Sequence, residues 1–279
     1  MTEEEKSGTI GMSQSAGQDT KAGGKKAEAR EAKPGRRKAS AAESKEGRKS
    51  RTAKGTEAGK APVSQADLEA RKELAAGLIA GLKKEYPDAG CTLDYNEAWK
   101  LLVSVRLAAQ CTDARVNVVV ETLYEKFPDV KSLAEADEDE VEEIVRPCGL
   151  GRSKARDICA CMKILWEDYG GNVPDDFDKL LKLPGVGRKS ANLIMGDVFG
   201  KPAIVTDTHC IRLVNRMGLV DGIKEPKKVE MELWKLIPPE EGSDFCHRLV
   251  YHGREVCTAR TNPHCERCCV NAICKKSGI

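Results

Sequence analysis

The amino-acid sequence predicts an all-α protein, and three observations support this fold class. Aromatic residues make up only 4% of the chain, so its apolar part is mainly Leu, Val, Ile and Ala, which suits packed helices better than a β-sandwich. Apolar residues recur with helical spacing in several stretches after residue 63. No alternating run is long enough to indicate a sheet.

The first predicted helix begins after Ser64. The pattern Ser64-x-x-Asp67 is typical of a helix N-terminus, and apolar residues then keep helical spacing up to Pro87. Residues 1–63 before it carry 15 basic and 9 acidic residues and almost no large apolar side chain. Such a segment cannot bury enough surface to offset its chain entropy, so we expect a disordered basic tail. It serves either as a solubilising extension or as an electrostatic tether to DNA.

Further helices are predicted at four places before residue 170. They span residues 96–109, 113–127, about 133–145 and 153–169, and the third of them is strongly acidic. Gly, Pro and Asn mark the joints between these segments. An amphipathic stretch at residues 211–217 predicts a further helix near the middle of the second half.

The composition indicates a protein with a buried core, but it does not indicate a partner. Hydrophobic residues make up 40% and charged residues 32% of the 279 residues, enough for one large or two small domains. The formal net charge is only +2, so a DNA-binding surface would have to be a local basic patch. No run approaches the roughly 18 apolar residues of a membrane span, and the N-terminus lacks the apolar core of a secretory signal. We therefore expect a cytoplasmic protein with no membrane partner, whose 12 cysteines are reduced or bound to metal.

A helix–hairpin–helix is predicted at residues 181–190, which read LKLPGVGRKS. Gly185 and Gly187 permit a tight turn and bring backbone N–H groups close to a ligand. The next helix begins at once and offers its free N–H groups and positive dipole end, an arrangement that binds phosphate without reading sequence. The alternative is a plain turn between packed helices. Arg188 and Lys189 argue against it, because cations beside a positive dipole end reduce stability.

Lys189 is the candidate nucleophile. A lysine amine attacks only when it is uncharged, and a helix N-terminus, the neighbouring Arg188 and partial burial all disfavour the ammonium form. We therefore hypothesise that Lys189 attacks a sugar C1′ and forms a Schiff base. A lysine that binds phosphate is the alternative.

Asp207 is the candidate carboxylate, in a segment that reads AIVTDTH at residues 203–209. Its position before an amphipathic stretch predicts an N-cap, and capping alone is one explanation of the residue. The functional explanation is an anion that supports positive charge on a sugar as its base leaves, as in glycoside hydrolysis. His209 is not expected to be catalytic.

Four cysteines near the C-terminus indicate a metal site. Within 18 residues they have the spacing C-x7-C-x2-C-x5-C, at Cys257, Cys265, Cys268 and Cys274. Thiolates this close together in a cytosolic protein bind either a tetrahedral zinc ion or a [4Fe–4S] cluster, and the spacing does not decide between them. Cys269 is a remote substitute for Cys268. The metal would be structural and would hold a loop with Arg254, Arg260 and Arg267 against phosphates, and the other seven cysteines are expected to be mostly small buried apolar residues.

Five stretches together carry a family resemblance. They are LAAQCTD at 107–113, LPGVGRKSAN at 183–192, VTDTH at 205–209, HGR at 252–254 and the four-cysteine loop. Residues 64–279 resemble the endonuclease III family of DNA glycosylase/lyases on these motifs. The resemblance implies a six-helix barrel at about 91–180, and an iron–sulfur domain formed by 64–90 and 181–279, with a DNA groove between them.

The resemblance also assigns residues to roles. It implies Lys189 as the Schiff-base lysine and Asp207 as the essential carboxylate. Gln110 would fill the gap left by a flipped nucleotide, and Leu150 would wedge the DNA. It further implies backbone contacts with DNA at Gly185, Gly187 and Arg188, and a [4Fe–4S] cluster on Cys257, Cys265, Cys268 and Cys274.

The chain departs from the family pattern in three places. The first gap between cluster cysteines, from Cys257 to Cys265, is seven residues rather than the usual six. Ser190 stands where threonine is common, and Gly151 stands where a bulkier residue is frequent.

The implied function is base-excision repair of DNA. The enzyme would remove oxidised pyrimidines from duplex DNA and cleave the abasic strand by β-elimination, as a monomer, associated with the nucleoid in a bacterium. The alternatives are a monofunctional adenine-mismatch glycosylase, which lacks the lysine at this position, and a non-catalytic iron–sulfur protein that binds DNA or senses redox state. A zinc-binding interaction protein is a further alternative.

Overall fold

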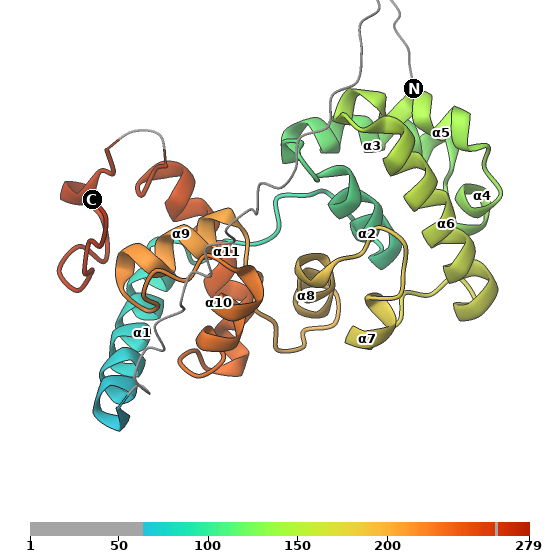
Figure 1. Ribbon diagram of the computed structural model, residues 1–279. Helices are drawn as coiled ribbons and strands as arrows, with labels where there is room; N and C mark the ends of the chain where they lie inside the picture. The colour runs from blue at the N-terminus through green and yellow to red at the C-terminus, as the bar shows by residue number, and fades with distance from the viewer. Residues whose placement is uncertain (1–63, 260–261) are drawn as a thin grey trace, which may run out of the picture. The chain divides into compact units, whose positions relative to one another are not determined.

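The structure is a computed structural model that describes residues 64–259 and 262–279 (Figure 1). This described part is helical and contains no strand, which confirms the predicted all-α class. The α-helices are α1 Gln65–Glu85, α2 Ala98–Leu107, α3 Asp113–Lys126, α4 Val130–Ala134, α5 Glu138–Val145, α6 Gly151–Tyr169, α7 Phe177–Leu180, α8 Arg188–Asp197, α9 Thr208–Met217, α10 Pro226–Leu233 and α11 Gly242–Glu255. Three 3-10 turns are η1 Arg146–Cys148, η2 Pro239–Glu241 and η3 Cys265–Arg267.

Most predicted helices occur where the sequence placed them. Ser64 caps α1, because its hydroxyl accepts a hydrogen bond from the Asp67 N–H at 3.1 Å. The helices predicted at 96–109, 113–127 and 153–169 are α2, α3 and α6. The expected tail at 1–63 lies outside the described residues. None of the described helices combines the length and apolar character needed to cross a membrane.

The single helix predicted at about 133–145 is wrong, because two helices occupy this region. Asp129 starts α4 with a reciprocal capping box to Ser132, and the helix ends at Ala134. Asp137 then caps α5 by accepting from the Asp139 N–H at 2.7 Å. Aspartate is more favourable at an N-cap, where its carboxylate accepts a hydrogen bond from a backbone N–H, than inside a helix. Asp137 therefore starts a new helix instead of continuing α4.

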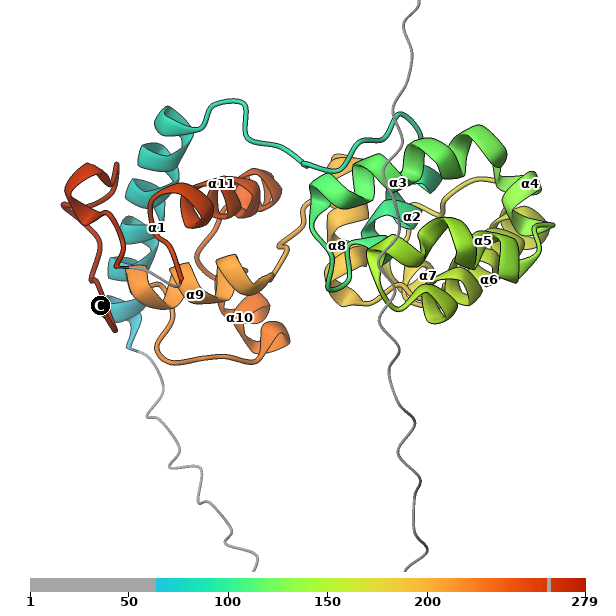
Figure 2. The ribbon, with the colours of Figure 1, turned by 90° about the horizontal axis from the view of Figure 1, so that it is seen from above.

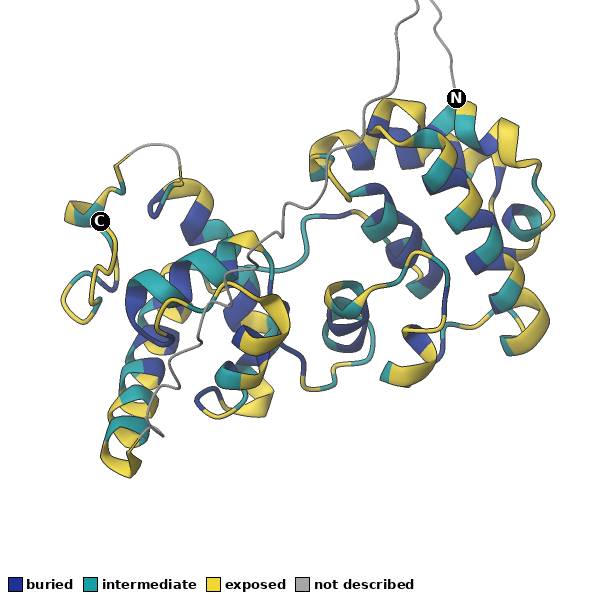
Figure 3. Cartoon of the chain, in the orientation of Figure 1, coloured by how far each residue is buried: buried dark blue, intermediate teal, exposed yellow. Residues whose placement is uncertain are grey.

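The buried apolar residues form two cores. The first includes residues from Leu93 to Ala203 and lies among α2 to α8, where α6 packs against α2, α4 and α5. The second is built by α1, α9, α10 and α11 and continues to Val270. Figures 1 and 2 show these four helices gathered together, and Figure 3 marks the buried positions along both groups of helices in dark blue.

Apolar packing groups the predicted hairpin with the first core. Leu183, before the turn, and Ala191 and Ile194, after it, are buried there. The change from one core to the other falls between Ala203 and Ile204. The family resemblance instead groups residues 181–279 with the cluster domain, so the domain division stays a prediction.

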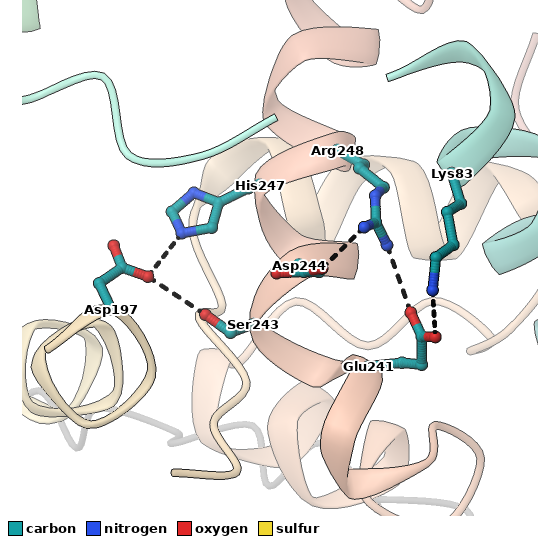
Figure 4. Close-up of polar contacts among 7 residues, drawn as sticks. All are labelled: Lys83, Asp197, Glu241, Ser243, Asp244, His247 and Arg248. Atoms are coloured by element: carbon teal, nitrogen blue, oxygen red, sulfur yellow. Dashed lines mark hydrogen bonds and ion pairs between the residues drawn. The ribbon is translucent and has the colours of Figure 1, made fainter. Parts of the chain in front are cut away.

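Polar contacts join the end of α8 to α11 and join α1 to α11 (Figure 4). The Asp197 carboxylate, at the last residue of α8, contacts His247 Nε2 at 2.7 Å and accepts from the Ser243 hydroxyl at 3.2 Å. On the other side of α11, Glu241 pairs with Lys83 of α1 and with the buried Arg248. Hydrogen bonding to Lys83, together with Arg248, holds the pKa of Glu241 below its ordinary value.

An ion pair joins the start of α8 to α10. The Arg188 guanidinium binds Glu230 through two hydrogen bonds, Nε to Oε2 at 2.6 Å and Nη2 to Oε1 at 2.7 Å. The Glu230 side chain is only 2% exposed, whereas that of Arg188 is 37% exposed. Arg188 also lies over the Phe177 ring, 5.0 Å from its centre. Glu230 therefore explains the arginine at a helix N-terminus, where its charge would otherwise be unfavourable.

We expect the two partners of this ion pair to differ in their effect on stability. Arg188→Met leaves a buried carboxylate that keeps the long hydrogen bond from Trp234 Nε1, at 3.4 Å, but has lost its cation, and should lower the free energy of unfolding by about 3 kcal/mol. Glu230→Gln leaves a partly hydrated guanidinium and should cost only about 1 kcal/mol. The loss in Arg188→Met should shrink as the pH falls, because the stranded carboxyl can then protonate. Urea denaturation at two pH values measures both effects, and an equal loss in the two variants would contradict the assignment.

Candidate active site

Lys189 and Asp207 lie on the wall of one cavity. The cavity has a volume of about 240 Å³ and is lined by residues of both cores. Its charged and titratable lining residues are Lys189, Asp207, Asp113, His247 and Arg254. The Thr92 and Ser190 hydroxyls, the Cys91 and Cys246 thiols and apolar side chains complete the wall. The structure thus brings together the two residues that the sequence singled out for chemistry.

The hairpin places Lys189 at this cavity. Gly185 has φ +75°, and a Cβ there would lie 2.7 Å from Cδ of Arg106, so both the backbone and the packing require glycine. Gly187 is the N-cap residue of α8 and supplies no side-chain cap to the first N–H groups of the helix. A Cβ on Gly187 would meet nothing within 4 Å, so the backbone at Gly187 borders open space.

Lys189 is exposed, not partly buried as expected from the sequence. Within residues 64–259 and 262–279 its Nζ has no hydrogen bond and no ion pair, although the residue is near enough to Asp113 and His209 for its charge to act on both. The neighbouring Arg188 pairs with Glu230 and does not line the cavity. Lys189 is therefore the cation that the hairpin presents to the cavity.

Asp207 is both a helix cap and a part of the cavity wall. Its Oδ1 accepts a hydrogen bond from the Cys210 N–H at 2.7 Å, which confirms the predicted N-cap of α9. The segment before it, residues 203–206, is buried and fixes the position of the carboxylate. One oxygen is engaged by the cap, so the second is available to face positive charge in the cavity.

Sequence reasoning missed Asp113 and its partners. The Asp113 carboxylate accepts from the Thr92 hydroxyl at 2.5 Å and pairs with Arg254 Nη2 at 2.7 Å. Burial alone would raise the pKa of Asp113, but the hydrogen bonds from Thr92 and Arg254 and the charge of Lys189 outweigh it and lower the pKa. The signal was available, because Asp113 ends the LAAQCTD stretch at the first turn of a predicted helix. Arg254, expected at phosphates, is paired with this carboxylate.

Two histidines differ in their relation to the cavity. His247 lines it, and its ring is oriented by Asp197. Nothing in the sequence motifs pointed to His247. His209 lies outside the cavity wall, and burial lowers its pKa.

Gln110 and Leu150 share an unusual backbone conformation. Each has a left-handed φ, +58° for Gln110 and +54° for Leu150, and only Lys276 shares this feature among the described residues other than glycine. Both side chains are exposed, and Leu150 is 56% exposed although it is apolar. Left-handed backbone costs about 1 kcal/mol or more in such residues.

The four cysteines of the C-terminal loop lie around one cavity. Cys257, Cys265, Cys268 and Cys274 line a single small cavity of about 20 Å³, together with His252 and Met217. Cys269 is exposed and does not belong to this wall. No group of three His, Cys, Asp or Glu side chains in the described chain is arranged to hold a single metal ion.

The remaining cysteines and the arginines of this loop have separate surroundings. Five of the seven other cysteines are buried, while Cys91 and Cys111 are partly exposed. Arg267 Nη2 donates to the Glu255 carbonyl at 2.7 Å. Arg260 lies outside the described residues.

The chain is similar to known DNA-repair proteins. Residues 103–239 match the family described as "HhH-GPD superfamily base excision DNA repair protein". Endonuclease III of Synechocystis is 43% identical over 209 residues, which cover 74% of this chain and 94% of the relative. Endonuclease III of Escherichia coli is 36% identical and covers 71% and 93%.

Solved structures give the same result. A non-covalent endonuclease III–DNA complex superimposes with a TM-score of 0.70 at 40% identity, covering 74% of this chain and 95% of the other. A trapped covalent endonuclease III–DNA intermediate gives a TM-score of 0.69, also at 40% identity, with coverages of 74% and 96%. A thermostable thymine-DNA glycosylase, at 23% identity and a TM-score of 0.65, shares the fold. With a free lysine and a carboxylate at one cavity and relatives of this similarity over nearly their whole length, the chain belongs to the endonuclease III family and is a base-excision DNA repair enzyme, a DNA glycosylase and abasic-site lyase.

Proposed function

We propose that this enzyme removes oxidised pyrimidines from duplex DNA, with Lys189 as its nucleophile and Asp207 as the supporting carboxylate. The observation that carries the proposal is the common cavity, because it holds an amine without a partner and a carboxylate with a free oxygen. If Lys189 only bound phosphate, a carboxylate on the same cavity wall would serve no function. A capping aspartate would need no cavity.

The proposed reaction follows from these two groups. The Lys189 amine bonds to C1′ as the bond between C1′ and the base breaks, and the bonding electrons leave with the base. Asp207 stabilises the positive charge that develops on the sugar. Loss of a proton from the amine and opening of the sugar ring give a Schiff base. This makes the C2′ proton acidic, and its removal expels the 3′ phosphate by β-elimination.

DNA binding is proposed to use backbone groups at the hairpin. The free N–H groups at the start of α8 and the open space at Gly187 suit a phosphate. Gln110 and Leu150 would enter the duplex where a damaged pyrimidine leaves the stack. Extrusion costs a few kcal/mol and is cheapest for a weakly paired base, which favours damaged sites.

The four cysteines are proposed to hold a [4Fe–4S] cluster. The fit rests on four thiols that surround one cavity, with Cys268 rather than Cys269 among them. When bound, the cluster would act as a structural crosslink of residues 257–274. The buried His252, whose Nε2 lies 3.4 Å from Cys268 Sγ, would orient one ligand.

Two alternatives make different predictions. An adenine-mismatch glycosylase without lyase activity has no use for a free amine at the position of Lys189. A non-catalytic iron–sulfur protein would bind DNA but leave an abasic strand intact. We also propose that the enzyme acts as a monomer, in the cytoplasm and at the nucleoid in a bacterium.

Borohydride reduction should trap the wild-type protein covalently on DNA that contains an abasic site. Lys189→Gln should lower the yield of adduct by about 100-fold or more, because it removes the nitrogen that forms the Schiff base. Gel electrophoresis of labelled DNA measures the adduct. Lys163→Gln, which removes an exposed lysine of α6, serves as the control and should trap normally. Undiminished trapping by Lys189→Gln would refute the assignment.

Asp207→Asn separates the two roles of Asp207. Asparagine is as good an N-cap as aspartate, so the free energy of unfolding should change by less than about 0.5 kcal/mol. The rate of base removal should fall by about 100-fold, because the anion is lost. Single-turnover kinetics and urea denaturation test the two halves. A stable variant with normal base removal would leave Asp207 as a cap alone.

Metal analysis distinguishes the proposed cluster from zinc. The purified protein should be brown and contain about four iron atoms per chain. Cys268→Ser should lose most of the iron, whereas Cys269→Ser should retain it. Zinc in place of iron, or iron loss in Cys269→Ser alone, would contradict the ligand set.

A further inference from the structure

Lys154 is a fully buried lysine of α6 that has no role in the reaction proposed above. Its exposed fraction is 0%, and no carboxylate pairs with it in the described chain. Its Nζ donates instead to the backbone carbonyls of Leu107 and Cys148, both at 2.8 Å. Burial lowers the pKa of Lys154. Burying an amino group costs free energy unless its hydrogen bonds compensate for the lost hydration.

The two carbonyls lie at the helix ends that precede Gln110 and Leu150, the two exposed residues with left-handed backbone. Leu107 is the last residue of α2, three positions before Gln110, and Cys148 ends η1, two positions before Leu150. Carbonyls at helix ends have no partner inside their helix, so Lys154 supplies the missing donor to both. One side chain thereby fixes two loops that are far apart in the sequence.

Neighbouring contacts make this connection rigid. Arg106, one residue before Leu107, donates to Asp157 at 2.7 and 2.9 Å and to the Ser153 hydroxyl at 3.2 Å. These contacts join the end of α2 to the first turns of α6, which begin directly after Leu150. Side chains of α6 therefore contact the segment before Gln110 and the segment before Leu150, and Lys154 contacts both segments.

We propose that Lys154 is a positioning residue that holds Gln110 and Leu150 in the geometry needed to enter the duplex. The inference rests on the proposed function, because it assumes that these two side chains replace the extruded nucleotide. Without the ammonium, the two carbonyls lose their donor and the strained residues can relax toward ordinary backbone angles. The chemistry at Lys189 does not depend on this contact.

Lys154→Met tests the proposal, because methionine has a similar length but no donor. Single-turnover rates are measured on duplex DNA with an oxidised pyrimidine and on single-stranded DNA with an abasic site, which needs no extrusion. We expect the duplex rate to fall roughly 10- to 100-fold, as for other small misplacements of positioning groups, while the single-strand rate stays within about twofold of wild type.

The control is a variant that weakens the same core without touching the loops. Leu165→Ala empties a fully buried site on α6 and should reduce stability while affecting the two substrates equally. An equal loss on both substrates in Lys154→Met, or a duplex-specific loss in Leu165→Ala, would overturn the proposal. If Lys154→Met does not fold, Lys154→Gln replaces it: its amide ends one bond closer to the backbone than Nζ and cannot hold both carbonyls at the present 2.8 Å, so the duplex rate should still fall more than the single-strand rate. An equal loss on both substrates would overturn the proposal.

A double-mutant cycle measures the coupling between Lys154 and Leu150 on duplex DNA, which is expected only if Lys154 acts through Leu150. If Lys154 acts through Leu150, the losses of Lys154→Met and Leu150→Ala on duplex DNA should be clearly less than additive. Full additivity would overturn the inference. Failure of the proposed function is a separate result: the wild type would then neither cleave nor trap abasic DNA, whereas here only the duplex-specific effect of Lys154 would be missing.

Discussion

The ion pair between Arg188 and Glu230 is the interaction on which the site depends. It occupies the first position of α8, the helix whose next residue is Lys189. Without a buried carboxylate on α10, two adjacent cations at a positive helix end would repel each other and the helix end. Because Glu230 takes up the charge of Arg188, Lys189 is the cation at the start of α8 that lines the cavity. The far end of α8 is held in turn by Asp197 through His247 and Ser243.

The helices and most of the site could be predicted from the sequence because their signals are local. Helical spacing, the Ser64 cap and the glycines of the hairpin act within a few residues, and they placed α2, α3, α6 and the turn before α8. The family resemblance then pointed to Lys189 and Asp207. The structure places both on one cavity wall. The single helix expected near residue 140 failed for a local reason too, since Asp137 caps a new helix.

What the sequence could not provide are the contacts between segments far apart in the chain. The partner of Arg188 lies 42 residues later, and that of Asp113 lies 141 residues later. No periodicity or motif encodes such pairs. For the same reason Arg254 was expected at phosphates, whereas it is held by a carboxylate at the cavity. The buried Lys154 escaped notice because its partners are backbone carbonyls, which no sequence pattern marks.

The proposed nucleophile and its proposed carboxylate lie at different apolar cores, since the boundary between the cores falls at Ala203 and Ile204, just before Asp207. If Lys189 and Asp207 act together as proposed, base removal requires both cores to be folded and to meet at the cavity. A nascent or partly unfolded chain would then have the amine without the anion, so glycosylase activity would report on the integrity of the whole tertiary structure.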